Sequence, residues 1–196
     1  KVHCGLFGEI GVLSFNGNKL ITTGGGGALI TNDNKIADKA RHLSTTAKIK
    51  HPWEFDHDEI GWNDRMPNIN AALGVAQLEV IDKRLVQKSI LLNKYIETFA
   101  LFDNLEVIVD TSENLNNNWL VNIRYLDSNK KNAGTKRDDL LLKAHSENIY
   151  LRPAWTLMHK LKMYRTNPKT NLDVAEDQEL RIISLPSSPQ LASEKD

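Results

Sequence analysis

The stretch VLSFNGNKLITTGGGGALIT, residues 12–31, places one lysine between an Asn-Gly pair and four consecutive glycines. Asn16-Gly17 is a strong signal for a tight turn, because both residue types tolerate positive φ. The apolar residues 11–15 and the segments LITT and ALIT on either side of the glycines predict strands. The stretch therefore predicts a strand–turn–strand unit that carries Lys19 beside its turn.

Lys19 lies between apolar strands, and the hydroxyl of Ser14 comes five residues earlier, across the turn. A partly desolvated lysine loses some preference for its charged form, and its neutral amine can then attack a carbonyl carbon. The glycines leave two alternatives open: an irregular strand, or a place where a ligand or another subunit approaches the backbone. No Gly-Lys-Ser/Thr follows them, which excludes a Walker loop.

The composition excludes several classes of protein. The 196 residues are 40% hydrophobic and carry a formal net charge of zero, so we expect neither a nucleic-acid nor a membrane partner. Cys4 is the single cysteine, which allows no intrachain disulfide and fits a cytoplasmic protein. No apolar run approaches the ~20 residues that a membrane span requires. The opening residues KVHCGLFGEIG have no signal-peptide core and no initial Met, so we expect part of a longer protein.

The rest of the chain changes its pattern after a long helix that ends near Phe99. Before it, we expect a helix from Asn32 or Asp33 to about Leu43 and an aromatic loop over 48–65. A long helix should begin near Pro67 and continue to about Phe99. Short alternating elements follow, which predict a small α+β domain. These are strands at 105–109, 119–126 and 149–155, and helices at 136–148 and 173–185.

Two other groups of residues give weaker evidence for a functional site. His51, Asp56, His57, Asp58 and Glu59 offer metal-ligand types, but their spacing fits no familiar pattern, so we predict no metal site. No G-x-S-x-G nucleophile elbow occurs, so a Ser/His/Asp hydrolase is not favoured.

Several motifs together resemble one family. SFNGNKLITTGGGGALIT (14–31) resembles the lysine segment of the DegT/StrS-type sugar aminotransferases, which are pyridoxal-phosphate (PLP) enzymes of the aspartate-aminotransferase fold. The resemblance continues through EIGWNDRMPNINAALGVAQLE (59–79), LRPAWTLMHKLKMY (151–164) and RIISLPSSP (181–189). It is closest to the branch acting on UDP-linked 4-keto-6-deoxy-N-acetylhexosamines. The implied fold class is α/β, the C-terminal part of a fold-type I PLP transferase: residues 1–80 the tail of the large domain, and residues 81–196 a connecting helix and a small α+β domain.

The resemblance implies a role for each matching residue. Lys19 matches the lysine that forms the Schiff base with PLP, and Ser14 matches the serine that binds the cofactor phosphate. Asn63 matches the asparagine that reaches the cofactor of a neighbouring subunit, which implies a homodimer with shared active sites. Arg152 and His159 lie in the segment that faces the substrate in such enzymes.

The implied reaction is ping-pong transamination of a 4-keto nucleotide sugar, with glutamate as the amino donor. Related 3-dehydratases carry histidine where this chain has Lys19, so transamination is favoured. Asp64 departs from the family pattern, in which tyrosine or serine is common. The upstream half, which supplies most of the PLP pocket, is not among these residues. Two alternatives therefore stay open: an inactive remnant that folds and dimerises without cofactor, and a nucleotide-sugar binding module without chemistry.

Overall fold

The structure is a computed structural model that describes residues 2–111 and 116–192. It divides into two compact units, Lys1–Asp82 and Lys83–Asp196.

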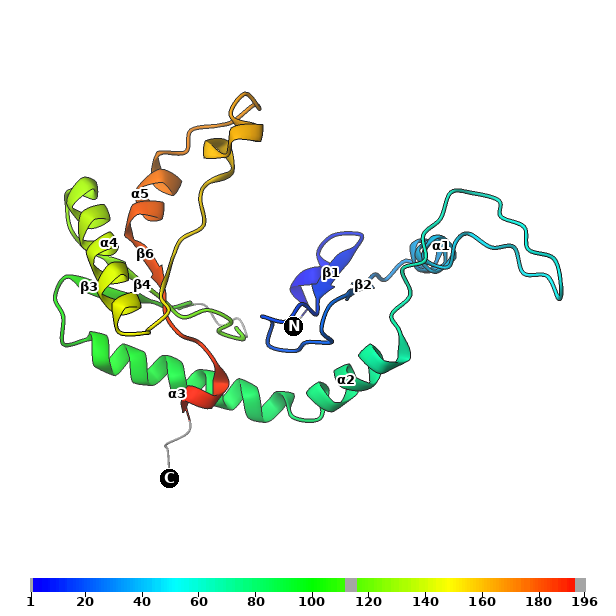
Figure 1. Ribbon diagram of the computed structural model, residues 1–196, viewed down its shortest axis with the longest axis horizontal. Helices are drawn as coiled ribbons and strands as arrows, with labels where there is room; N and C mark the ends of the chain where they lie inside the picture. The colour runs from blue at the N-terminus through cyan, green and yellow to red at the C-terminus, as the bar shows by residue number, and fades with distance from the viewer. Residues whose placement is uncertain (1, 112–115, 193–196) are drawn as a thin grey trace. The chain divides into compact units, whose positions relative to one another are not determined.

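The first unit contains a hairpin of two antiparallel strands, β1 (Gly11–Ser14) and β2 (Gly27–Ile30), preceded by a short 3-10 turn, η1 (Cys4–Leu6) (Figure 1). Their register pairs Gly11 with Ile30 and Ser14 with Gly27. The two strands were expected from the apolar flanks. The expected strand at LITT is wrong, because these residues fold back into the loop that joins β1 to β2.

The four glycines are largely explained by this loop. Gly24 and Gly26 adopt φ values of 80° and 82°, a region that side chains with a Cβ rarely occupy. A Cβ on Gly27 would collide with the carbonyl oxygen of Leu13 on the paired strand. Gly24 and Gly26 are therefore explained by the loop and Gly27 by the strand pairing, while the space around Gly25 stays open.

Helix α1 (Asn34–Ser44) begins where the sequence predicts. The Asp33 carboxylate caps it by accepting hydrogen bonds from the backbone N–H groups of Lys35 (2.7 Å) and Ile36 (3.3 Å). The loop that follows returns to the end of α1, where an isolated bridge pairs Thr45 with Asn63.

The expected single helix from Pro67 to Phe99 is wrong. The structure has two helices, α2 (Asn68–Leu78) and α3 (Ile81–Phe99), separated at Glu79 and Val80. No glycine or proline marks this break, so the sequence offers no breaker signal for it.

The second unit is a four-stranded antiparallel sheet with three helices. Its strands lie in the order β3 (Leu105–Ile108), β4 (Asn122–Tyr125), β6 (Ile182–Ser184) and β5 (Arg152–Pro153). The helix expected over 173–185 is partly wrong, because it ends at Arg181 and the chain enters a central strand. Between α3 and that strand, β6, the helical elements are α4 (Lys130–Ser146), η2 (Met158–Lys160), η3 (Lys162–Tyr164) and α5 (Asp173–Arg181).

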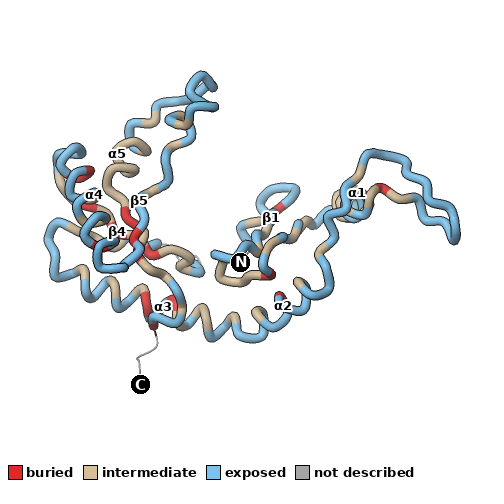
Figure 2. The backbone as a smooth tube through the Cα atoms, in the orientation of Figure 1, coloured by how far each residue is buried: buried red, intermediate tan, exposed pale blue. Residues whose placement is uncertain are grey.

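One face of this sheet forms the core of the second unit. Ile123 of β4 and Ile183 of β6 are register partners, and both are fully buried. Side chains of α3 and α4 pack against this cluster, among them Leu92 and Leu140. Along β4 and β6 buried residues alternate with half-exposed ones, so the strands have one core face and one more open face. Figure 2 colours the backbone by burial, with buried residues in red.

Side chains of α3 hold the segment that follows β6. Lys88, which is 2% exposed, donates from Nζ to the carbonyl oxygens of Trp119 (3.0 Å) and Ser187 (2.5 Å). Tyr95 donates from its hydroxyl to the carbonyl oxygen of Pro186 at 2.9 Å. The backbone after β6 is thus fixed to α3 by polar groups that reach into the interior.

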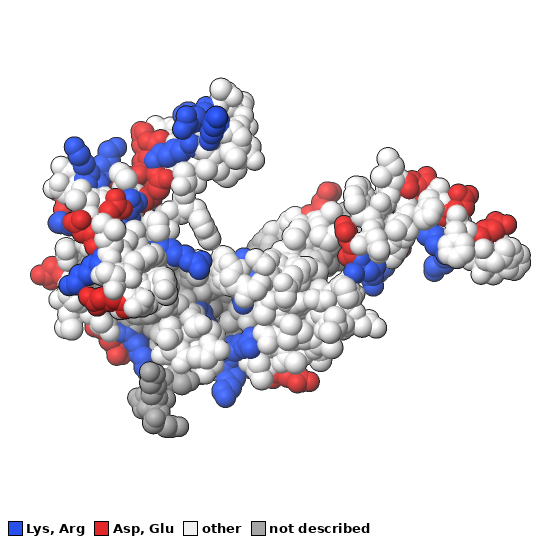
Figure 3. All heavy atoms as spheres, viewed as in Figure 1, with Lys and Arg blue, Asp and Glu red and all other residues white. Residues whose placement is uncertain are grey.

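Within the described ranges, no helix is both long and apolar enough to cross a lipid bilayer. Basic and acidic side chains are interspersed on the face shown in Figure 3, with no single basic field of the kind that binds nucleic acid.

Candidate active site

Lys19 lies at the end of a tight turn in the loop between β1 and β2. Its backbone N–H donates to the carbonyl oxygen of Asn16 at 3.0 Å, which closes the turn that the Asn-Gly pair predicts. The residue is half-buried. Ser14 ends β1 and is exposed; its Oγ accepts a hydrogen bond from the Asn16 N–H at 3.4 Å. One short hairpin therefore carries both residues.

The loop that carries Lys19 is fixed at its base. The backbone of Phe15 makes three of these bonds. Its N–H donates to the carbonyl oxygen of Gly26. Its carbonyl oxygen accepts from the Thr23 N–H (3.1 Å) and from the Thr22 hydroxyl (3.1 Å). These bonds close the loop upon itself, so Lys19 sits on an ordered turn rather than a free segment.

A second set of contacts ties this loop to α2. Asn70 donates from Nδ2 to the carbonyl oxygen of Thr23 at 2.6 Å, and Thr23 is 2% exposed. Gly74 faces the same residue so closely that a Cβ there would lie 2.9 Å from the Thr23 methyl. The helix that follows Pro67 thus positions the hairpin that holds Lys19.

Asn63 is exposed at the base of the aromatic loop. Its neighbours fix the backbone: Trp62 donates to the carbonyl oxygen of Leu43 at 2.7 Å, and Asp64 donates to that of Ser44 at 3.1 Å. These bonds anchor the position of Asn63 to the end of α1.

Arg152 and His159 belong to the second unit. Arg152 is exposed in β5, where it pairs with Ser184 of the central strand. His159 is turned towards α5: its Nε2 lies 2.9 Å from Oε1 of Glu176, and its side chain is 11% exposed. The ring of His159 is therefore engaged by a carboxylate within its own unit.

Polar side chains of the aromatic loop bind backbone groups of the same part of the chain. His57 Nδ1 lies 2.7 Å from the carbonyl oxygen of Thr46, and His51 Nδ1 accepts from the Glu54 N–H at 3.0 Å. The backbone N–H of His57 also donates to Asp56 at 2.8 Å. These contacts hold the backbone of the loop in its shape.

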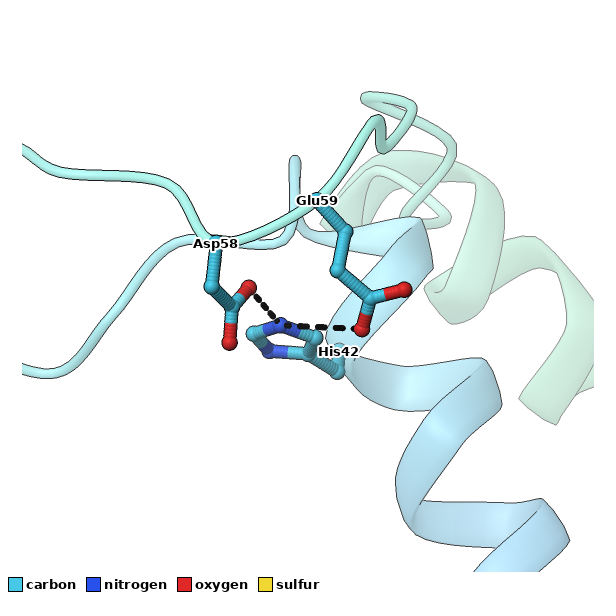
Figure 4. A group of neighbouring side chains, drawn as sticks. All are labelled: His42, Asp58 and Glu59. Carbon is cyan, nitrogen blue, oxygen red and sulfur yellow. Dashed lines mark hydrogen bonds and ion pairs between the residues drawn. The ribbon is translucent and has the colours of Figure 1, made fainter.

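Two acidic residues of the loop meet a histidine that the sequence did not connect with them. His42 of α1 places Nε2 2.6 Å from Oδ1 of Asp58 and 4.0 Å from Oε1 of Glu59 (Figure 4). This is the one His/acid cluster with metal-ligand spacing among the residues that the structure describes. Lys39 also pairs with Glu59, and the hydrogen bond from His42 lowers the pKa of Asp58. The cluster joins the loop to α1 through the His42–Asp58 hydrogen bond and the Lys39–Glu59 ion pair.

The structure thus brings Ser14 and Lys19 onto one hairpin and places Asn63 in the same unit, whereas Arg152 and His159 share one segment of the other. Sequence reasoning missed His42 because its partners lie 16 residues and more away, and no spacing rule links them.

Comparisons with known proteins show the family to which the chain belongs. The chain matches the DegT/DnrJ/EryC1/StrS aminotransferase family over residues 2–196. EpsN of Bacillus subtilis (strain 168), named as a pyridoxal phosphate-dependent aminotransferase, is 33% identical over 195 residues, which are 97% of this chain and 48% of EpsN. GDP-perosamine synthase of Escherichia coli O157:H7 is 33% identical over 193 residues, 98% of this chain and 50% of that protein.

Solved structures give the same result. Helicobacter pylori PseC, an aminotransferase involved in the biosynthesis of pseudoaminic acid, has a TM-score of 0.87 at 25% identity, covering 96% of this chain and 50% of PseC. A DegT DnrJ EryC1 StrS aminotransferase from Brucella abortus has a TM-score of 0.83 at 27% identity, covering 99% and 49%. The expected fold-type I architecture is confirmed, and the chain spans about half the length of these relatives. Because the match runs through nearly every residue, the chain belongs to the DegT/DnrJ/EryC1/StrS family of pyridoxal-phosphate-dependent sugar aminotransferases.

Proposed function

We propose that the protein to which these residues belong transfers an amino group from an amino-acid donor, glutamate, to the C4 ketone of a nucleotide sugar. The observation that carries the proposal is the position of Lys19, half-buried at the end of an ordered turn in a member of this family. The proposal concerns the whole protein, because the chain spans about half the length of its relatives.

The residues of the hairpin fit PLP. The cofactor carries an aldehyde, which needs an amine, and a phosphate, which needs hydrogen-bond donors; Lys19 and Ser14 supply one of each on the same short hairpin. When bound, PLP supplies an electron-withdrawing ring that stabilises negative charge at the carbon that loses its proton.

Lys19 then has two tasks in the proposed cycle. Its Nζ removes the proton from the α-carbon of the amino donor in the first half-reaction. In the second half-reaction it delivers a proton to C4 of the sugar. Because the donor product leaves before the sugar enters, the kinetics are ping-pong. The contact between Thr23 and α2 holds the turn in place during both steps.

The remaining residues take supporting roles in this proposal. Asn63 binds the cofactor phosphate of a second copy of the protein, so that a homodimer shares its active sites. Its exposure, on a backbone fixed to α1, supports that role. Arg152 is exposed and suits an anionic part of the substrate. We propose that His159 also contacts the substrate, with its ring oriented by Glu176.

The proposal also names the nucleotide of the substrate. The names of the relatives include both a GDP-linked sugar, in GDP-perosamine synthase, and a UDP-linked one, in a Campylobacter jejuni transaminase that is 32% identical over 92 residues. We keep the UDP-linked N-acetylhexosamine as the proposed substrate on the basis of the sequence motifs.

The test is a titration of the purified chain with PLP, followed by borohydride reduction and mass-spectrometric mapping of the adduct. A saturable visible band and an adduct at Lys19 are expected, and both should be lost in Lys19→Ala. Lys35→Ala, an exposed lysine in the first turn of α1, is the matched control and should label normally.

Labelling scattered over surface lysines, with no saturable band, would contradict the proposal for this chain. It would favour the alternative of a remnant that folds without binding its cofactor. If an adduct forms at Lys19, addition of glutamate should bleach the band as the amino group moves to the cofactor.

A further inference from the structure

The turn that carries Lys19 begins with the one Asn-Gly pair of the sequence. Asn16 is followed by Gly17, and no other glycine of the chain follows an asparagine. Asparagine is a chemically labile residue, because the backbone nitrogen of the next residue can attack its side-chain amide carbon. The attack is easiest where the next residue is glycine, since a Cβ there would crowd the attacking nitrogen. The pair that forms the turn is therefore also a reactive pair.

Both partners in this reaction are accessible. Asn16, Gly17 and Asn18 are all exposed, and a Cβ placed on Gly17 would meet no atom within 4 Å. The side-chain amide of Asn16 donates a long hydrogen bond from Nδ2 to Oδ1 of Asn18, and its 3.5 Å lies at the outer limit for such bonds. In the part of the chain that the structure describes, no group accepts a hydrogen bond from the Gly17 N–H. Neither the amide nor the nitrogen is therefore shielded or firmly held.

The reaction consumes water and releases ammonia. The nitrogen of Gly17 forms a bond to Cγ of Asn16, and the bond from Cγ to Nδ2 breaks. The side-chain nitrogen leaves as ammonia, which takes up the proton of the Gly17 N–H. Water then opens the cyclic imide at one of its two carbonyl carbons. Opening at Cγ leaves aspartate, whereas opening at the main-chain carbonyl carbon leaves isoaspartate, in which the chain runs through Cβ and Cγ.

Isoaspartate is incompatible with the turn at Lys19. The turn is closed by the Lys19 N–H, which donates to the carbonyl oxygen of Asn16 at 3.0 Å. In isoaspartate this carbonyl group becomes a carboxylate outside the main chain, and the chain between residues 16 and 17 gains one backbone atom. The hydrogen-bonded ring of the turn cannot keep its size, so the position of Lys19 is no longer fixed.

Both products also add a negative charge close to Ser14. The backbone N–H of Asn16 donates to Oγ of Ser14 at 3.4 Å, so a carboxylate on residue 16 lies near that hydroxyl. The proposed function gives Ser14 the phosphate of the cofactor, and like charges a few ångströms apart repel each other even in water. The conversion therefore opposes phosphate binding, whichever product forms.

We propose that Asn16 deamidates spontaneously through this imide, and that the conversion disables the hairpin that carries Lys19. The Asn-Gly pair then limits the working life of the site without the action of another enzyme. The modification itself follows from Asn16 and Gly17, whereas its effect on PLP binding rests on the proposed function.

The first test incubates the purified chain in neutral buffer and follows the mass of its tryptic peptides. Exchange of the side-chain NH₂ for OH should raise the mass of the peptide that ends at Lys19. Electron-transfer fragmentation places the gain at Asn16 and distinguishes isoaspartate from aspartate. Asn18 is the internal control, because it is exposed on the same turn but precedes a lysine, and it should stay intact. No gain at Asn16, or an equal gain at Asn18, would overturn the inference.

Gly17→Ala tests the attack itself. The added Cβ enters open space, and Gly17, unlike Gly24 and Gly26, has no positive φ, so the turn should form as before. The Cβ nevertheless crowds the attacking nitrogen, and most of the conversion should be lost. Gly25→Ala is the matched control, because Gly25 lies in the same loop with open space around it, and it should convert as fast as the unmodified chain. Equal conversion in Gly17→Ala would contradict the proposed attack.

Two readouts measure the consequence for the hairpin. Hydrogen–deuterium exchange of the Lys19 N–H, followed by NMR, needs no cofactor and should be faster in the isoaspartate form, in which the turn is lost. Asn16→Asp carries the charge without the longer backbone, so it should raise the Kd for PLP by about fivefold or more and leave this exchange unchanged. Unchanged exchange in the isoaspartate form would refute the effect on the turn.

The outcome can be separated from that of the proposed function. A fresh chain that does not label at Lys19 refutes the proposed function for this chain, while the mass and exchange measurements still decide the inference. A fresh chain that labels at Lys19, and labels equally well after Asn16 has been converted, keeps the proposed function and refutes the inference.

Discussion

Replacing Lys88 by methionine should change how the stability of the second unit depends on pH. Burial lowers the pKa of the Lys88 ammonium from its usual 10.5 to about 8. The unfolded chain therefore binds this proton more tightly than the folded chain, so the folded state is at its most stable above 10.5 and loses stability as the pH falls through 8.

The magnitude follows from the two pKa values. The difference between 10.5 and about 8 corresponds to about 3 kcal/mol over the full range. Between pH 7 and pH 9.5 the same linkage gives an increase of about 2 kcal/mol in the free energy of unfolding of the unmodified chain. Lys88→Met cannot show this increase. It also leaves the carbonyl oxygens of Trp119 and Ser187 without their donor, a cost that does not vary with pH.

Urea denaturation at a series of pH values measures the effect. Fluorescence of Trp119 and Trp155 reports on the second unit in a chain whose exposed Trp53 and Trp62 are replaced by phenylalanine. The difference in free energy of unfolding between this chain and its Lys88→Met variant should rise with pH. Burial raises the pKa of Tyr95, which also titrates in alkali, but it is present in both chains and cancels.

The control is Lys83→Met, an exposed lysine on the same helix, whose difference from the parent chain should be flat. A flat difference for Lys88→Met as well would show that Lys88 has an ordinary pKa in the folded state, and it would refute the argument from burial.

Three further predictions concern the first unit. Asn70→Ala should lower the free energy of unfolding by about 1 kcal/mol, because it removes the donor to the buried Thr23 carbonyl. It should also reduce the yield of PLP adduct at Lys19. An unchanged yield would show that α2 does not position the turn. Gly27→Ala should destabilise the hairpin by about 1–3 kcal/mol in a thermal melt, because the added Cβ would collide with the Leu13 carbonyl oxygen. Gly25→Ala should be tolerated, because the space around it is open. Equal melting temperatures for the two variants would contradict this geometry. His42→Asn should raise the pKa of the Asp58 carboxyl in a ¹³C NMR titration, and no change would mean that His42 does not hold it.

Local signals predicted much of the first unit. Asn16-Gly17 predicted the turn, and Asp33 predicted the start of α1, because a turn and a cap are each decided by a few neighbouring residues. The pattern of the predicted hairpin drew attention to Lys19 and Ser14, and the family resemblance then implied their roles. The bond from Asn70 to Thr23 was not predictable, since it joins residues 47 positions apart.

In the second unit, the strand that local sequence did not predict depends on tertiary contacts. Ile182 and Ile183 continue an apolar helical pattern, but they are β-branched and enter the gap between β4 and β5 as a strand. The pairing of Asn122 with Ser184 and of Ser184 with Arg152 follows from the register of that strand, and no local pattern in residues 173–185 predicts it.

The central position of β6 also bears on how the protein is made. Strand β5 has β6 as its sheet partner, and β4 needs β6 on its second edge, so neither is fully paired until Ser184 has left the ribosome. The earlier helices can form as they emerge, but the sheet they cover cannot close. We therefore expect the second unit to fold late during synthesis, with an unpaired strand edge that a chaperone can recognise until β6 arrives.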